Sequence, residues 1–247
     1  MKNALRKKRL SLYNLLPSSC IFLKIPNVRL SLLILLLSST VICRSQNPER
    51  FQSEYTTFEK LDSVTLAEKG SLDTDHLFVG SSSIRFWLSL KEDYPDKDVL
   101  NRGFGGSHMS DLLTKREALI AKYNPQKIFI YEGDNDIADG EHTIEIAYET
   151  EQLLNYVFQI LPDTDVYLIA AKPSILRWQY KEDYIQLNRE YLKLSLRNPQ
   201  VHYIDVWSAM VDDHGEVYPN IFIDDQLHMN ARGYKIWKKV VGPYLYE

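Results

Sequence analysis

Between residues 76 and 240 the sequence alternates short apolar runs of β-strand character with longer stretches of helical character. The predicted strands cover residues 76–80, 98–101, 127–131, 165–171 and 201–206. The predicted helices lie around residues 108–122, 143–161, 180–197 and 231–240. Continuous apolar strands that alternate with helices are typical of a parallel sheet covered on both faces. We therefore predict one doubly wound α/β domain with a five-stranded parallel sheet, whose functional residues follow the carboxyl ends of the strands.

The first 45 residues differ in character from the rest of the chain. They carry eight lysines and arginines and no acidic residue, and residues 30–43 form an apolar run flanked by Arg29 and Arg44. A run of 14 residues is short for a bilayer-spanning helix, which needs about 20, but suits the apolar region of a secretory signal. We predict that residues 1–45 are a signal peptide cleaved after Ser45 or an N-terminal membrane anchor, with lipidation of Cys43 as a further alternative. The protein is then exported, to the periplasm or the medium.

The remainder of the chain is acidic and contains no cysteine. Of the 29 basic residues 21 remain, against 33 acidic ones, so residues 46–247 have a net charge of −12. Nucleic-acid binding depends on neutralising phosphates with basic side chains, and this charge argues against it. Both cysteines, Cys20 and Cys43, lie in the leader, which excludes a thiol nucleophile and cysteine metal ligands from the rest.

A helical segment precedes the alternating pattern. Phe51, Tyr55, Phe58 and Leu61 follow one another at helical spacing and fall on one face. We predict that residues 46–70 form a helix that packs by this face on a domain covering residues 71–247.

Residues with catalytic potential follow the first two predicted strands. The first strand runs into Gly80 and three serines, and a serine on such a turn has its hydroxyl at the edge of the sheet and its N–H beside a helix start. A serine that caps a helix is the ordinary alternative. The second strand is followed by the glycine-rich sequence NRGFGGS at residues 101–107, whose amides a ligand can approach closely. This sequence matches neither phosphate-binding nor dinucleotide-binding glycine patterns, and a flexible turn is its alternative.

The third strand ends in the sequence GDND at residues 133–136. Together with Asp139 its aspartates raise the question of a calcium site, but the spacing places Ala138 and Asp139 where a calcium-binding loop needs a ligand and a glycine. The side-chain amide of Asn135 is better suited to donate a hydrogen bond to an oxyanion. We predict no metal site here.

Near the C-terminus, Asp225 precedes His228 by three residues. A carboxylate at this spacing can accept from one imidazole nitrogen and leave the other as a general base. Four other histidines lack such a partner and are interpreted as structural or solvated: His76, His142, His202 and His214. The sequence also lacks the paired-histidine patterns of zinc enzymes.

Taken together, the four motifs resemble the conserved blocks of the SGNH or GDSL-type hydrolases, and the resemblance runs from about Leu77 to Tyr246. The family implies a three-layer α/β/α flavodoxin-like fold without a cofactor. By position, Ser82 is then the nucleophile, His228 the general base and Asp225 its orienting carboxylate. The implied oxyanion hole consists of the Gly106 N–H, the Asn135 side-chain amide and the Ser82 N–H.

The chain departs from the family pattern before the nucleophile. The usual Gly-Asp-Ser reads Gly-Ser-Ser here, so Ser81 stands where the family has an acid. In a run of three serines, Ser81 and Ser83 are alternatives to Ser82, and Gly105 is an alternative to Gly106.

The implied activity is hydrolysis of carboxylic esters by an exported serine esterase. A short acyl group, such as O-acetyl on a carbohydrate, is our first expectation for the substrate. A lysophospholipase or thioesterase of the same family is the alternative, and a non-catalytic carbohydrate-binding or surface-binding protein is the alternative from another class. Residues 172–178, after the fourth strand, are expected to overhang the cleft. Three residues are candidates to contact a sugar or an anionic ester: Trp87, Arg85 and Arg102. The alternative is that the tryptophan is a packed ring and the arginines are surface charges.

Overall fold

The computed structural model describes residues 50–247, and the predicted leader of residues 1–45 lies outside this part of the chain. Its centre is a five-stranded sheet. The strands are β1 (His76–Gly80), β2 (Val99–Gly103), β3 (Lys127–Tyr131), β4 (Asp165–Ile169) and β5 (Val201–Ile204). All four pairings are parallel, in the order β2-β1-β3-β4-β5. The predicted five-stranded parallel sheet is confirmed, in the order typical of flavodoxin-like folds.

Nine α-helices connect or flank these strands within the described residues. They are α1 (Gln52–Lys69), α2 (Ser82–Arg85), α3 (Leu90–Asp93), α4 (Met109–Thr114), α5 (Arg116–Leu119), α6 (Asp134–Ala138), α7 (Thr143–Ile160), α8 (Lys181–Arg197) and α9 (Ala231–Tyr246). Short 3-10 turns lie at η1 (Ala121–Tyr123), η2 (Trp178–Tyr180), η3 (Ser208–Met210) and η4 (Pro219–Ile221). None of the helices in residues 50–247 combines the length and the apolar character needed to cross a bilayer.

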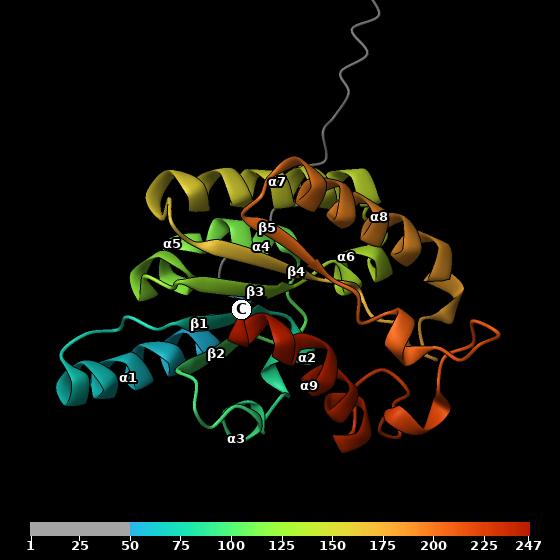
Figure 1. Ribbon diagram of the computed structural model, residues 1–247, viewed down its shortest axis with the longest axis horizontal. Coiled ribbons are helices and arrows are strands. Elements are labelled where there is room, and N and C mark those ends of the chain that lie inside the picture. The colour runs from blue at the N-terminus through green and yellow to red at the C-terminus, as the bar shows by residue number, and fades with distance from the viewer. Residues whose placement is uncertain (1–49) are drawn as a thin grey trace, which may run out of the picture. The chain divides into compact units, whose positions relative to one another are not determined.

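The sheet separates two apolar cores, and Figure 1 shows α7 and α8 on one side of it and α9 on the other. Successive strand residues point to opposite faces. Leu77 and Val79 therefore lie in the core beneath α4, α7 and α8, whereas Phe78 lies in the core beneath α9. Inside the second core, Phe78 stacks on Phe129 with ring centroids 4.4 Å apart. This is the three-layer α/β/α arrangement that the sequence resemblance implies.

Several predicted boundaries are wrong, and local chemistry explains the differences. The second strand reaches Gly103, two residues beyond the predicted end, because the buried Arg102 and Gly103 still pair with β1. The single helix predicted over residues 108–122 is divided into α4, α5 and η1, with a break at Lys115. The short helices α2, α3 and α6 were not predicted, because four or five residues are too few to establish a helical period.

Helix α1 packs on the first core by its N-terminal half, as predicted for Phe51, Tyr55 and Phe58. Leu61 departs from this prediction, since it is 50% exposed. The buried residue of that turn is its neighbour Asp62, whose Oδ1 lies 2.6 Å from Arg102 Nη2. A charged pair thus fastens α1 beside the edge strand β2, which an apolar pattern cannot reveal.

Replacing Asp62 by alanine is expected to lower the free energy of unfolding by about 3 kcal/mol, because it leaves the buried Arg102 guanidinium without its counter-charge. Tyr123, whose hydroxyl also bonds Asp62, loses a partner too. Urea unfolding measures the effect, and Glu59→Ala on the exposed side of the same helix is the control. Equal stability of the two variants would contradict this role for the pair.

Candidate active site

The candidate residues lie at the carboxyl edge of the sheet, around β1 and β3. These neighbouring strands flank the point where the order of the strands reverses, which is the usual position of a site in this architecture. The chain turns sharply out of β1 at Gly80, whose φ is +126°. A Cβ there would lie 2.0 Å from the Tyr131 carbonyl oxygen, so only glycine allows β1 to lie so close to β3 before the turn.

The structure distinguishes the three serines that follow this turn. Ser81 and Ser83 are buried, with 1% and 3% of their surface exposed. Ser82 begins α2 and is partly exposed, and its Oγ lies 2.9 Å from His228 Nε2. Of the three serine hydroxyls, the Ser82 hydroxyl is the one placed against the histidine.

His228 and Asp225 occupy the turn before α9. The Asp225 Oδ2 atom lies 2.6 Å from His228 Nδ1, while its Oδ1 accepts the backbone N–H groups of Leu227 and His228, each at 2.9 Å. Burial acts to raise the pKa of Asp225, but the hydrogen bonds from His228 and from these amides outweigh it and lower the pKa to about 2. Asp225 is therefore ionised at neutral pH. Phe86 meets the His228 ring edge-on, with centroids 5.1 Å apart, and packs against this side of the imidazole.

The glycine-rich loop after β2 approaches the same edge. Gly106 has a φ of +80°, a conformation that favours glycine, and its carbonyl accepts from Arg50 Nη2 at 2.6 Å. The next residue, Ser107, is fully buried and donates its hydroxyl to Glu132 Oε1 at 2.6 Å. Gly105 faces the guanidinium of Arg85, since a Cβ on Gly105 would lie 2.9 Å from Arg85 Nη1. The loop is thus fixed by hydrogen bonds at Gly106 and Ser107.

Asn135 lies in the first turn of α6, directly after β3. Its Nδ2 donates to the Ser107 carbonyl at 2.9 Å, and its Oδ1 accepts from Arg177 Nη2 at 3.0 Å. One amide hydrogen is therefore committed to the glycine-rich loop. An NH₂ group has a second hydrogen, which can serve a ligand.

A buried polar network supports Asn135 from behind. Asp134 accepts hydrogen bonds from the hydroxyls of Tyr131 and Tyr184 and is paired with Arg177 and with Lys172. Burial acts to raise the pKa of Asp134, but the positive charges of Lys172 and Arg177 and the Tyr184 hydrogen bond lower it to about 2. The ionised Asp134 in turn fixes Arg177, which holds the Asn135 amide.

Residues 172–178 do follow β4 toward this edge, but their charged side chains are already engaged. Lys172 is 1% exposed and donates to the Leu227 carbonyl at 2.9 Å, beside His228. Trp178 stacks on Trp207 with the ring planes 12° apart. Leu176 remains 53% exposed, so it is available to line the approach to the site.

Two further residues considered as ligand contacts are structural. Trp87 is 1% exposed and donates its indole N–H to Asp93, and Arg102 is buried in the ion pair with Asp62. For both, the alternative interpretation is correct: Trp87 is a packed ring, and Arg102 is a paired charge, although it is buried rather than at the surface. Arg85 is the exception, because its side chain is 46% exposed while it pairs with Glu54.

Residues 65–236 match the sequence model of the GDSL-like lipase/acylhydrolase family. This match spans more than half of the chain and all four motifs. The chain belongs to this family. Family membership supports ester hydrolysis as the chemistry of this protein. Among curated proteins no significant match is found.

Solved structures of low sequence identity share the fold of this GDSL-like protein. A Streptococcus pneumonia protein, described provisionally as a platelet activating factor, has a TM-score of 0.70 at 24% identity, over 79% of this chain and 92% of its own. A GDSL-like lipase from Bacteroides thetaiotaomicron has a TM-score of 0.61 at 14% identity, over 81% and 97%. An acetylxylan esterase from Geobacillus stearothermophilus has a TM-score of 0.58 at 15% identity, over 70% and 94%.

The sequence did not identify the residues that position the candidate site. Arg177 was considered only as part of a loop over the cleft, and Asp134 only as a calcium ligand. Their link to Asn135 joins segments more than 40 residues apart, so no local spacing contains it. The sequence did offer one signal for this link. A basic residue, Arg177, follows the predicted fourth strand, an acidic residue, Asp134, follows the third, and parallel strands bring such residues to the same edge of the sheet.

Proposed function

We propose that this protein is a serine esterase that hydrolyses carboxylic esters through an acyl-enzyme. The observation that carries the proposal is the chain of hydrogen bonds from Ser82 Oγ to His228 Nε2 and from His228 Nδ1 to Asp225. A serine is a weak nucleophile unless a base takes its proton, and this arrangement supplies the base and the carboxylate that orients it. The Geobacillus esterase has been solved as catalytic mutants of one serine, one histidine and one aspartate, which supports the same set of residue types here.

In the proposed reaction, His228 removes the Ser82 proton while Oγ attacks the acyl carbonyl. The Asp225 carboxylate holds the proton on Nδ1, so that Nε2 is free to accept, and it stabilises the imidazolium that forms. His228 then returns the proton to the leaving alcohol. Water then gives a proton to the same nitrogen while its oxygen attacks the acyl carbon. The bond from this carbon to Ser82 Oγ breaks, the acid leaves, and His228 returns the proton to Oγ.

The oxyanion of each tetrahedral intermediate is assigned to three donors. They are the Gly106 N–H, the second amide hydrogen of Asn135 and the Ser82 N–H at the start of α2. The first N–H groups of a helix have no acceptor within it and carry partial positive charge, which suits an oxyanion. Gly106 and Asn135 are both bound to their surroundings, so these donors are preorganised.

We further propose a short acyl group, such as O-acetyl on a carbohydrate, as the substrate. Acetylxylan is the substrate class in the description of the Geobacillus neighbour, and the candidate serine is reached from an exposed edge. One observation favours the alternative of a longer acyl chain. Phe86 and Leu88 are 42% and 84% exposed and line a groove with Met229, next to His228.

One experiment tests both levels of the proposal. The protein is incubated with a fluorophosphonate probe and with p-nitrophenyl esters from acetate to long acyl chains. We expect labelling, and turnover that is highest on acetate and falls with chain length. Preference for long chains would favour the lysophospholipase or thioesterase alternative. Neither labelling nor turnover would favour a non-catalytic binding protein.

Replacing Asn135 by alanine is expected to lower kcat by about 10²–10³-fold, because one oxyanion donor is lost. KM for p-nitrophenyl acetate should change little, since the donor acts mainly on the charge that develops in the transition state. Arg177 remains held by Asp134 in this variant, so the fold around the site is retained. A decrease of less than about fivefold would contradict the role assigned to Asn135.

Export of the enzyme is part of the proposal and rests on the leader alone. Its basic residues, followed by the apolar run at 30–43, are the supporting observation. Fractionation of cells expressing the full chain tests it. A cleaved product outside the cytoplasm is expected, recovery of the intact chain with membranes would indicate an anchor, and cytoplasmic recovery would contradict export.

A further inference from the structure

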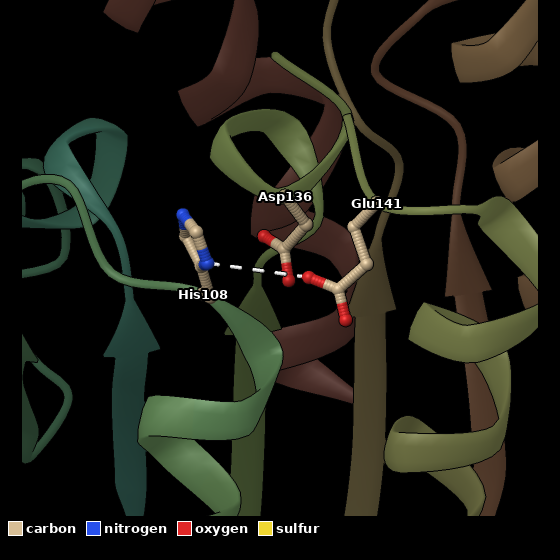
Figure 2. A group of neighbouring side chains, drawn as sticks. All are labelled: His108, Asp136 and Glu141. Atoms are coloured by element: carbon tan, nitrogen blue, oxygen red, sulfur yellow. Dashed lines mark ion pairs between the residues drawn. The ribbon is translucent and has the colours of Figure 1, made fainter. Parts of the chain in front are cut away.

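A second polar cluster lies beside the candidate oxyanion hole, and the proposed reaction does not use it. It consists of His108, Asp136 and Glu141, and one potential ligand atom from each lies within 4.8 Å of the other two. Figure 2 shows the Asp136 carboxylate between the His108 ring and the Glu141 carboxylate. The three residues come from two segments, the end of the glycine-rich loop and the turn that begins in α6.

Asp136 is the most deeply buried member of this cluster, with no surface exposed. Its Oδ1 accepts the Met109 N–H at 2.8 Å, but its Oδ2 has no hydrogen-bond partner among the described residues. Buried carboxylate oxygens are nearly always satisfied by a donor, a water or a cation. An unpartnered oxygen in this position indicates a ligand that the protein side chains do not supply.

The His108 ring is placed so that one nitrogen meets a carboxylate outside the cluster and the other faces into it. Its Nε2 lies 2.9 Å from Asp139 Oδ2, and its Nδ1 lies 4.0 Å from Glu141 Oε2. With the proton on Nε2, donated to Asp139, the Nδ1 lone pair faces the two carboxylates. Histidines that bind metals usually donate their other N–H to a carboxylate in this way.

The surroundings of the cluster carry an excess of negative charge. Burial raises the pKa of Glu149 to about 7, and the nearby charges of Glu141, Glu145 and Asp111 add to the effect. A bound cation would offset the repulsion among these acidic side chains.

We propose that His108, Asp136 and Glu141 bind one divalent transition-metal ion, of which Zn²⁺ fits best. An imidazole nitrogen with two carboxylates suits zinc, whereas calcium and magnesium favour sites made of oxygen alone. Tetrahedral zinc with bonds of about 2.1 Å separates its ligand atoms by about 3.4 Å. Glu141, partly exposed at the end of its turn, can move the short distance required, and its exposed side admits water as a further ligand.

The turn that supplies the acidic ligands is already formed. Glu141 N–H donates to the Asp136 carbonyl at 2.9 Å, and Gly140, with a φ of +87°, lets the chain reverse between them. Asp136 directly follows Asn135, and His108 lies two residues after Gly106. A metal ion at this place would therefore join the two segments that carry the proposed oxyanion donors. The ion would stabilise these two segments and would not touch the reacting atoms. Metal binding at this place does not depend on the esterase proposal.

The test uses the full chain, stripped of metal with a chelator and titrated with Zn²⁺, with Ca²⁺ and Mg²⁺ in parallel. Calorimetry and thermal unfolding are the readouts. We expect the unmodified protein to gain on the order of 5–10 °C in Tm at a hundredfold excess of Zn²⁺ over Kd. Glu141→Gln and His108→Gln should each weaken this binding at least tenfold, by loss of a charged or nitrogen ligand. The control Glu151→Gln removes an exposed carboxylate of α7 and should bind as the unmodified protein does.

Other groups of the chain that bind zinc are the same in every variant. A difference in zinc binding between the variants and the unmodified protein therefore reports on this site alone. If His108→Gln does not fold, Glu141→Gln decides the question alone, since its side chain is partly exposed. No zinc-dependent rise in Tm, or unweakened binding in Glu141→Gln, would overturn the proposal. An equal response to Ca²⁺ would overturn the assignment to a transition metal.

Discussion

Replacing Ser82 by alanine is expected to reduce kcat for p-nitrophenyl acetate by about 10⁴–10⁶-fold and to abolish labelling by a fluorophosphonate. The hydroxyl is the atom that would form the acyl-enzyme, and its Oγ is 2.9 Å from the nitrogen that would take its proton. Without it, His228 and the oxyanion donors remain, but attack must come from water. Residual activity then reflects the donors and substrate binding alone.

The neighbouring serines provide matched controls for this prediction. Ser81→Ala and Ser83→Ala each remove a hydroxyl of the same run, but both side chains are buried and neither is placed against His228. We expect each to change kcat by less than about tenfold. Urea unfolding and circular dichroism establish that all three variants fold. Activity that survives in Ser82→Ala but is lost in Ser81→Ala or Ser83→Ala would move the nucleophile and contradict the assignment.

The sequence was sufficient to predict the sheet and the residues at its carboxyl edge. Strands such as β1 and β3 are continuous apolar runs, so their bounds were predicted to the residue. A polar motif directly after such a strand must lie at one edge of a parallel sheet. For this reason Ser82, Asn135 and His228 could be expected to converge although they are far apart in the chain. The register within the serine run could not be predicted, because burial distinguishes Ser82 from its neighbours and burial depends on the tertiary packing.

The supporting residues escaped prediction because their partners come from distant segments. Asp62 is an acidic residue on helix α1, and its contacts with Arg102, Lys122 and Tyr123 explain why it is buried in place of Leu61. Arg177 and His108 are similar cases. Arg177 is recognised as a supporting residue by its hydrogen bond to Asn135, and His108 by its position next to Asp136 of α6. Both contacts form only when the strands are assembled into the sheet.

The two sides of the candidate site differ in how they are held. Asn135 is fixed by a buried network in which Asp134, Arg177 and two tyrosines satisfy one another. His228 instead lies on an exposed turn, and Asp225, its principal polar contact there, has a side chain that is 41% exposed. Rigid donors suit the oxyanion, whose position is fixed in the reaction. The proposed base, His228, depends far more on one carboxylate, so a small chemical change at Asp225 should have a large effect.

Replacing Asp225 by asparagine is expected to reduce kcat by about 10⁴-fold with little change in the fold. The asparagine amide can donate a hydrogen bond to His228 Nδ1, which an aspartate cannot do. The imidazole proton is then placed on Nε2, so that the nitrogen 2.9 Å from Ser82 Oγ becomes a donor and cannot act as a base. The variant also loses the charge that stabilises the imidazolium.

The adjacent Asp224→Asn variant is the control, since it makes the same chemical change in an exposed carboxylate one residue away. It should retain the activity of the unmodified enzyme. Steady-state assays on p-nitrophenyl acetate, with equal concentrations of folded protein, give kcat and KM separately. The loss should appear in kcat. If Asp225→Asn keeps more than about a tenth of the activity, the carboxylate does not orient the base, and His228 must be held by its backbone and by Phe86 alone.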